Sequence, residues 1–427
     1  MRKYYTLIIL FLISILELHS QELILANADR LESSILAIAS FGADEAGGIS
    51  RHAYSEADLQ ARTHIIMLMK EAGLEVILDE AGNIIGRREG KNSKLPIICF
   101  GSHVDSVPSG GKFDGVAGVL VALETITLLN ANHITTNHPL EVIVFTDEEG
   151  GLIGSKALIG TLTALDLERI SNSGKIIKDG IRFLGGDPDQ IKKAKRDPSE
   201  FKAFLELHIE QGAILASEGN GIGVVEGIVG IEEWQVNIYG KANHAGTTPM
   251  NNRQDALLAA AKLIIAVNET VKSINGNQVG TVGEIMAEPG ASNVIPGHVK
   301  MSIELRDLSR EKILSVFEKI KPKMAAIEKE TGTSIEFKHE HTNIPAMLDD
   351  QIKNEIAQNA KELGLTYKFM PSGAGHDAQN MAKITPTAMI FIPSKGGISH
   401  SPKEFSSIED ITNGANVFFK TILAIDR

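Results

Sequence analysis

The 427-residue chain has very little cysteine and few aromatic side chains: Cys99 is its only cysteine, and aromatic residues make up 5% of the total. A single cysteine cannot form an intramolecular disulfide, so the fold must be stable without one, and a disulfide scaffold is excluded. The formal net charge is -12, and the basic run KKAKR at 192–196 is short. We therefore expect no nucleic-acid partner.

The strongly apolar stretch at the N-terminus is short. Arg2 and Lys3 precede the apolar run 4–16, and the small residue Ser20 comes directly before Gln21. This order predicts a secretory signal peptide over 1–20. The run is too short for a comfortable membrane-spanning helix, although an uncleaved anchor stays open as an alternative. We expect an exported, periplasmic protein with no stable membrane association after cleavage.

The apolar runs that follow predict an α/β fold. Runs at 96–101 and 140–146, with a helical pattern at 116–129 between them, indicate a parallel strand–helix–strand unit. Similar strands are predicted at 204–208 and 387–392, and the segment 153–201 has a helical character. We expect a catalytic domain with a mixed sheet flanked by helices.

A second pattern begins near residue 229. Residues 231–239 alternate as a half-exposed strand does, and the predicted order of elements up to 341 is βαββαβ. That order resembles a ferredoxin-like α+β sandwich. The predicted division is a catalytic domain over 21–228 and 342–427, with an inserted lid or dimerisation domain over 229–341.

Side chains that bind metals follow several of these predicted strands. His103, Asp105 and Asp114 lie in a glycine-rich loop at the carboxyl end of the first strand, where open α/β sheets bind ligands. Other strand ends carry the side chains Glu148, Glu149, His208, Glu210, His376 and His400. Each of them alone is more often structural, but charged groups beside buried strands cost several kcal/mol unless they are paired or metal-bound. Mixed imidazole and carboxylate ligands suit zinc or a neighbouring divalent ion.

Six motifs together carry a resemblance to a known family. They are GSHVDSVPSGGKFDG at 101–115, HIEQG at 208–212, HAGTTPM at 244–250, NVIPG at 293–297, GAGHDA at 373–378 and SHSPKE at 399–404. From about residue 32 to residue 425 the chain resembles the di-zinc aminoacylase and carboxypeptidase family. Within that family it resembles the branch of N-carbamoyl-amino-acid hydrolases, allantoate amidohydrolases and β-ureidopropionases.

The resemblance implies two divalent metal ions per chain, Zn²⁺ in the first place, with Mn²⁺, Co²⁺ or Ni²⁺ as alternatives. His103 and His208 would hold one ion, Glu149 and His400 the other, and Asp114 would bridge the two. The ions would lower the pKa of a shared water and polarise the bond that is cleaved.

The resemblance also implies the catalytic groups. Glu148 would be the general base, taking the proton of the water and returning it to the leaving nitrogen. Asp105 would accept a hydrogen bond from the far nitrogen of His103 and fix that ring. His244 would stabilise the oxyanion in the active site of a neighbouring subunit, which implies a homodimer built through the inserted domain. From the residues alone, His244 would be a loop histidine that forms a turn hydrogen bond.

Four further positions match substrate contacts of the family. Arg306 would hold the carboxylate of a small ureido or N-acyl amino acid through its bidentate fork. Asn293 and Gln211 would contact the carboxylate and the carbamoyl or amide end of that substrate, and His376 would make another contact with it. Three of them have a simpler explanation: Arg306 could pair with Asp307 or Glu304 on the surface, Asn293 could serve a turn, and Gln211 could begin a helix.

The expected activity is hydrolysis of a linear, non-peptide C–N bond in N-carbamoyl-L-amino acids or a related ureido acid such as allantoate. One alternative is a dipeptidase or aminoacylase, which His208 disfavours because many peptidase branches carry an acidic ligand there. The other is an exported binding protein without turnover, which Glu148 disfavours. Many carbamoylase-like members carry Arg-Phe after the paired glutamates, whereas this chain has Gly151, Leu152 and Ile153, so the exact substrate stays open.

Overall fold

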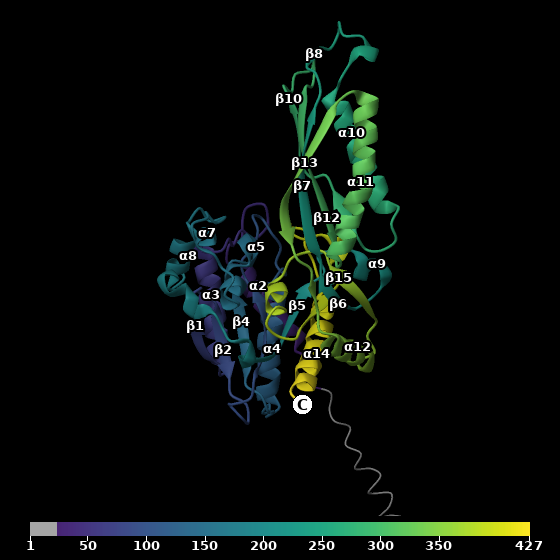
Figure 1. The fold of residues 1–427 in the computed structure, drawn as a ribbon. Coiled ribbons are helices and arrows are strands. Elements are labelled where there is room, and N and C mark those ends of the chain that lie inside the picture. The colour runs from purple at the N-terminus through teal and green to yellow at the C-terminus, as the bar shows by residue number, and fades with distance from the viewer. Residues whose placement is uncertain (1–23) are drawn as a thin grey trace, which may run out of the picture.

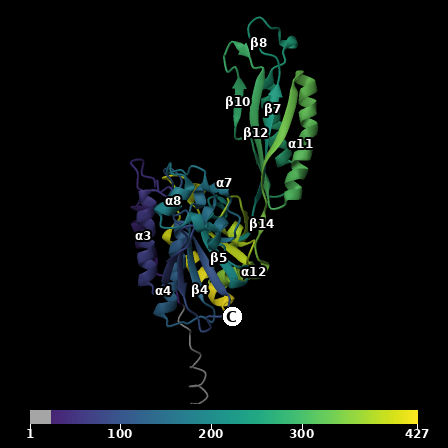
Figure 2. The same cartoon turned by 60° about the vertical axis from the view of Figure 1, so that its left-hand side comes forward.

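The computed structural model describes residues 24–427, so the predicted signal peptide at 1–20 lies outside the described residues. Within the described part, no helix is both long and apolar enough to span a membrane. The described residues form three sheets, the smallest of which pairs only β8 (Asn243–His244) with β11 (Val294–Ile295). A large sheet is enclosed by helices, and a smaller sheet with two long helices projects away from it (Figures 1 and 2).

The centre of the large sheet consists of parallel strands that are almost entirely buried. The strands β3 (Ile97–His103) and β4 (Leu140–Phe145) are parallel, and helix α4 (Val116–Ala131) connects them. On the other side of β3 follow β5 (Phe201–Ile209) and β16 (Thr387–Ile392), also parallel. Both faces of this region are covered, which explains why these strands are nearly continuous apolar runs. The predicted strand–helix–strand unit is confirmed.

Antiparallel strands complete the large sheet and make it mixed. The order is β1-β2-β4-β3-β5-β16-β6-β14, with β15 beside β6. The outer strands are β1 (Glu75–Leu78), β2 (Ile84–Arg88), β6 (Ile222–Ile228), β14 (Ala346–Met347) and β15 (Tyr367–Ser372). Four helices contribute buried apolar side chains to one core. They are α2 (Ala28–Ala39), α4 (Val116–Ala131), α12 (Asp350–Glu362) and α14 (Ile408–Ile425). Helix α3 (Glu56–Glu71) adds Ile65 and Met69 to it. The fold class expected from the sequence is confirmed.

The helical segment predicted over 153–201 consists of several short helices. They are α6 (Ile153–Leu158), α7 (Ala164–Leu167), α8 (Ile177–Phe183) and the 3-10 turns η1 (Pro188–Ala194) and η2 (Pro198–Glu200). Pro188 and Pro198 begin the two 3-10 turns, and the glycines at 160, 174 and 185 adopt positive φ between the helices. Proline and left-handed glycine interrupt a continuous helix.

The smaller sheet is antiparallel with the order β10-β12-β7-β13, and β9 also pairs with β12. Its strands are β7 (Gly230–Tyr239), β9 (Val279–Thr281), β10 (Ile285–Glu288), β12 (His298–Asp307) and β13 (Ser334–Asn343). Helices α10 (Ala256–Lys272) and α11 (Arg310–Thr331) pack on one face, where Trp234 stacks on Phe317 with ring centroids 3.9 Å apart. This is the ferredoxin-like arrangement expected from the order of elements. The exact domain boundaries stay a prediction.

Candidate metal centre

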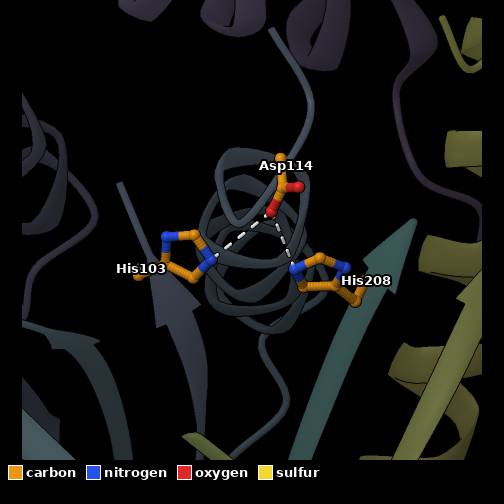
Figure 3. A group of neighbouring side chains, drawn as sticks. All are labelled: His103, Asp114 and His208. Atoms are coloured by element: carbon orange, nitrogen blue, oxygen red, sulfur yellow. Dashed lines mark ion pairs between the residues drawn. The ribbon is translucent and has the colours of Figure 1, made fainter. Parts of the chain in front are cut away.

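Three buried side chains meet at the carboxyl ends of the central strands (Figure 3). His103 ends β3, His208 lies near the end of β5, and Asp114 lies on the loop before α4. The Nε2 atom of His103 lies 3.5 Å from Oδ1 of Asp114, and Nε2 of His208 lies 3.1 Å from the same oxygen. Both imidazoles are 1% exposed. The glycine-rich loop allows this approach, since any Cβ at position 115 would overlap the His103 ring.

The second oxygen of Asp114 faces another pair of side chains. Nε2 of His400 lies 3.4 Å from Oδ2 of Asp114 and 3.6 Å from Oε1 of Glu149. Asp114 therefore presents one oxygen to each of two ligand sets, His103 with His208 and Glu149 with His400. The structure thus brings together all five residues that the sequence analysis named as metal ligands.

These residues fit divalent cations on physical grounds. The Nε2 atoms of His103 and His208 are buried and have no hydrogen-bond partner among residues 24–427, and such atoms are costly unless something binds them. Burial, together with the charge of Asp114, raises the pKa of Glu149 to about 7. Imidazole and carboxylate donors in this number are typical of zinc and related ions. The donor set therefore matches a divalent metal centre.

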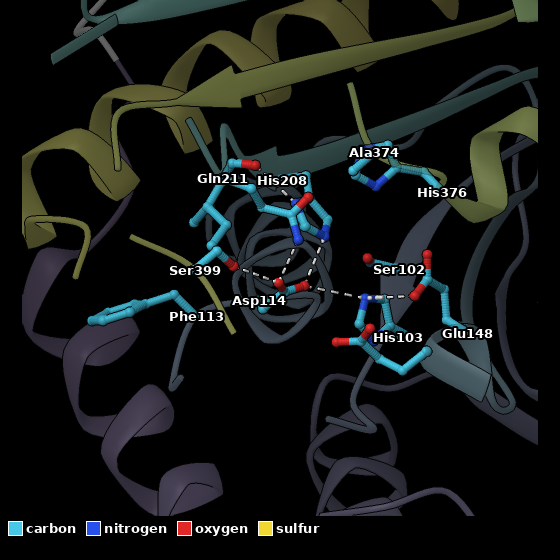
Figure 4. A network of polar contacts seen from close by, with 12 residues as sticks. Ser102, His103, Phe113, Asp114, Glu148, His208, Gln211, Ala374, His376 and Ser399 are labelled. Atoms are coloured by element: carbon cyan, nitrogen blue, oxygen red, sulfur yellow. Dashed lines mark hydrogen bonds and ion pairs between the residues drawn. The ribbon is translucent and has the colours of Figure 1, made fainter. Parts of the chain in front are cut away.

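Glu148 lies beside the centre without belonging to either ligand set. It follows β4 at the start of α5 (Glu148–Gly151), after Asp147, whose φ of 53° is left-handed. Its Oε2 atom lies 3.7 Å from Nε2 of His103 (Figure 4). Burial raises the pKa of Glu148 well above its ordinary value, and the neighbouring His103 opposes this. The geometry therefore leaves a buried carboxylate next to the ligands and available for proton transfer.

Asp105 holds the main chain of this turn. Its carboxylate accepts hydrogen bonds from the backbone N–H groups of Glu148 and Glu149, at 3.3 and 3.2 Å. The predicted contact with His103 is different: Nδ1 of His103 lies 3.1 Å from the carbonyl oxygen of Asp105 and 3.8 Å from the carboxylate. The carboxylate is turned toward the two N–H groups, so the main chain of Asp105 provides the acceptor for the ring.

Gln211 and His376 lie against the ligand sets. The amide nitrogen of Gln211 donates to Oδ2 of Asp114 at 2.6 Å and lies 3.3 Å from Nε2 of His400 (Figure 4). His376 is buried, with Nε2 2.9 Å from Oγ of Ser372 and its ring 4.5 Å from that of His208. Both positions predicted to contact substrate therefore border the candidate centre.

The remaining three predicted residues, Arg306, His244 and Asn293, fall into two places. Arg306 lies at the end of β12 and donates to Oε1 of Glu304 and to the carbonyl oxygen of Gly373, at 2.7 and 2.8 Å. It therefore reaches the loop that carries His376. His244, in β8 (Asn243–His244), pairs with β11 (Val294–Ile295) next to Asn293. Figure 1 places β8 at the end of the smaller sheet farthest from the large sheet, so within one chain neither residue joins the centre.

The structure also shows buried polar residues that the sequence analysis missed. Glu206 in β5 accepts hydrogen bonds from Ser102 Oγ and the N–H of Ala378, at 2.7 and 3.1 Å. Glu404 accepts three hydrogen bonds behind Asp114. Glu206 could have been found in the sequence as a glutamate within the otherwise apolar run of β5. Glu404 was part of the SHSPKE motif.

One of the ligand-type residues named at the strand ends has a structural role instead. The carboxylate of Glu210 accepts the N–H groups of Ile214 and Leu215, at 2.7 and 2.9 Å. It therefore caps the first turn of α9 (Ile214–Glu218).

A cluster of this kind at the strand ends of an α/β sheet is typical of enzymes that bind divalent metal ions. More specifically, the model of peptidase family M20/M25/M40 matches residues 99–424, and the chain belongs to that family.

Relatives within the family match nearly the whole chain. The N-carbamoyl-L-amino acid amidohydrolase of Geobacillus stearothermophilus is 38% identical over 93% of this chain and 98% of the relative. The allantoate amidohydrolase of Escherichia coli (strain K12) is 34% identical over 90% of this chain and 94% of the relative. The crystal structure of an amidase of the hydantoinase/carbamoylase family from Burkholderia multivorans has a TM-score of 0.88 and 34% identity, covering 94% of this chain and 98% of that one. This chain is a hydrolase of carbon–nitrogen bonds other than peptide bonds.

Proposed function

We propose that the chain is a binuclear zinc amidohydrolase that cleaves the carbamoyl C–N bond of N-carbamoyl-L-amino acids or of a related ureido acid such as allantoate. The observation that carries the proposal is the position of Asp114, whose two oxygens face two separate ligand sets. The activities named for the relatives support the substrate class.

His103 and His208 would hold one cation, Glu149 and His400 the other, and Asp114 both. Bound divalent cations supply Lewis acidity, which makes water easier to deprotonate and a carbonyl easier to attack. Glu148 accepts at its carboxylate the proton that the attacking water loses, and it returns that proton to the leaving nitrogen. Its side chain is 9% exposed beside His103, which limits the contact of bulk water with this transfer. With an N-carbamoyl amino acid, the products are ammonia, carbon dioxide and the amino acid.

Substrate orientation would come from both sheets. Arg306 contacts the loop of His376 through Gly373, which supports a role in which its guanidinium would bind the substrate carboxylate, exchanging its pairing with Glu304 for a bidentate one. Gln211 would contact the carbamoyl or amide end after turning away from Asp114. Asn293 lies next to β11, at the end of the chain's fold far from its own centre, so it would contact the carboxylate of a substrate in the site of a partner subunit.

A screen for ammonia release tests the proposal. We expect the metal-loaded chain to hydrolyse N-carbamoyl-L-amino acids or allantoate and to leave dipeptides intact. Glu148→Gln is the matched control, since it keeps the shape of the side chain and removes the base. Hydrolysis of dipeptides alone would replace the proposal with the peptidase alternative. Equal ligand binding and equal inactivity of the wild type and Glu148→Gln would favour a binding protein.

We further propose that the active unit is a homodimer in which His244 acts in the site of the partner subunit. The motivation is its distance from the centre of its own chain, at the far end of the smaller sheet (Figure 1). Its Nδ1 atom accepts the N–H groups of Gly246 and Thr247, at 3.0 and 3.2 Å, which orients the ring.

Mixed dimers test the role of His244. His244→Ala and Glu148→Gln chains should each be inactive alone. Random pairing of the two should restore about a quarter of the wild-type activity, because half of the dimers are mixed and each of those has one complete site. No recovery in verified mixed dimers would refute action across subunits.

Export is a separate proposal, which rests on the N-terminal sequence. N-terminal sequencing of the protein from a bacterial periplasmic fraction should begin near Gln21. A chain that retains Met1 in the cytoplasmic fraction would contradict it.

A further inference from the structure

Glu404 lies directly behind the loop that carries Asp114. Its side chain is 4% exposed. Oε1 accepts the backbone N–H groups of Phe113 and Asp114, at 2.9 and 3.1 Å. Oε2 accepts the hydroxyl of Ser399 at 2.9 Å. One buried carboxylate is therefore satisfied by groups from two loops that are far apart in the sequence, and it ties them together.

Ser399 continues this connection to the ligand itself. Its hydroxyl oxygen lies 3.0 Å from Oδ2 of Asp114, so it stands between two carboxylates (Figure 4). Oδ2 is the oxygen that faces His400. Glu404 thus determines the position of Asp114 twice, through its main chain and, by way of Ser399, through its side chain.

The two loops are also packed against each other around Glu404. The rings of Phe113 and Phe405 meet edge to face with centroids 5.9 Å apart. Gly111 leaves room for the carboxylate, because a Cβ at that position would overlap Glu404. His400, on the second loop, has a φ of 53° and a side chain that is 47% exposed. A strained, half-exposed ligand depends on its surroundings to stay in place.

The other ligand set has a different support. His103 and His208 lie on central strands of the large sheet and are 1% exposed. Their positions come from the sheet ladders between β3, β4, β5 and β16. Because Asp114 belongs to both sets, loss of Glu404 affects each of them. Only the set with Glu149 and His400 also loses the support of its own loop, so it is the more vulnerable one.

We infer that Glu404 is a positioning residue that holds Asp114 and the loop of His400 in register, and that it thereby sets the affinity of the second cation position. This inference rests on the proposed binuclear centre. Groups that orient metal ligands typically change affinity by about 10–100-fold when they are removed.

The test is a titration of the full, metal-free chain with Co²⁺, followed by visible spectra and equilibrium dialysis. We expect two bound equivalents in the wild type. In Glu404→Ala the second equivalent should bind about 10–100-fold more weakly and the first nearly as before. Glu404→Gln keeps an acceptor oxygen for the two N–H groups and should retain most of the affinity. Glu409→Gln, an exposed glutamate on the same segment, is the matched control.

Ser399→Ala covers the case in which Glu404→Ala does not fold, and it should weaken the second equivalent by about tenfold. Unchanged binding of both equivalents in Glu404→Ala or Ser399→Ala would overturn the inference. The inference would also be overturned if both equivalents bound equally more weakly and the melting temperature fell, because this result would indicate that Glu404 only stabilises the fold. A wild type that binds two equivalents but hydrolyses no ureido compound refutes the proposed function alone.

Discussion

Replacing Glu149 by glutamine should stabilise the metal-free protein at neutral pH. Burial, with the adjacent charge of Asp114, raises the pKa of Glu149 from 4.5 to about 7. The folded state therefore binds more protons than the unfolded state between these values, and the wild type loses stability as the pH rises through that window. At about 1.4 kcal/mol per pKa unit, the full loss above pH 7 is about 3 kcal/mol. Glutamine carries no charge at any pH, so the Glu149→Gln protein avoids this loss of stability.

The assay is the melting temperature in the presence of a chelator at pH 5 and pH 8. Glu149→Gln should melt roughly 5 °C above the wild type at pH 8, given the stability difference of about 3 kcal/mol, and close to it at pH 5. Glu409→Gln should match the wild type at both values. Saturating divalent cation should reverse the order at pH 8, because a ligand has been removed. A chelated Glu149→Gln protein that melts below the wild type at pH 8 would refute the reasoning.

Three further predictions concern catalysis, the second core and domain motion. Glu148→Gln should lower kcat by about 10²–10⁴-fold with unchanged metal content by elemental analysis; loss of metal would make Glu148 a ligand. Trp234→Ala removes the stack on Phe317 and should cost about 3–5 kcal/mol in denaturant unfolding of the smaller sheet, with Co²⁺ binding intact; a change in metal stoichiometry would contradict the separation of core and site. Binding of a substrate analogue should lower the radius of gyration measured by small-angle scattering, because the sheets close on it. An unchanged scattering curve would count against closure.

The local sequence was sufficient to predict the strands and helices whose hydrophobic pattern fits only one type of element. The apolar run before His103 corresponds to β3, which is buried on both faces of the sheet and is therefore apolar throughout. The alternating residues 231–239 correspond to β7, which is buried on one face only. The strand β15 and the helix α14 were not predicted from the sequence. Strand β15 alternates only partly in burial and is defined by its parallel pairing with β6, which sequence periodicity does not contain.

The site divides in the same way. The motifs identified the five ligand residues, and their residue types suited divalent ions. The resemblance named Asp105 as the acceptor for His103 without naming an atom. The structure shows that its carbonyl oxygen accepts, because the direction of the carboxylate depends on where the N–H groups of Glu148 and Glu149 lie. Glu404 was inside a quoted motif, yet its role needs the loop of Phe113, which is distant in the chain.

The amino-acid sequence by itself determined the class of fold, the identity of the side chains available for chemistry and the absence of any disulfide, since each follows from composition, local period and residue type. Tertiary structure alone decided which oxygen of Asp114 faces which histidine, how the buried carboxylates change their pKa, and that His244 lies far from its own centre. All three properties depend on distances between side chains on different strands and loops. Those distances are set by the packing of segments that lie far apart in the sequence.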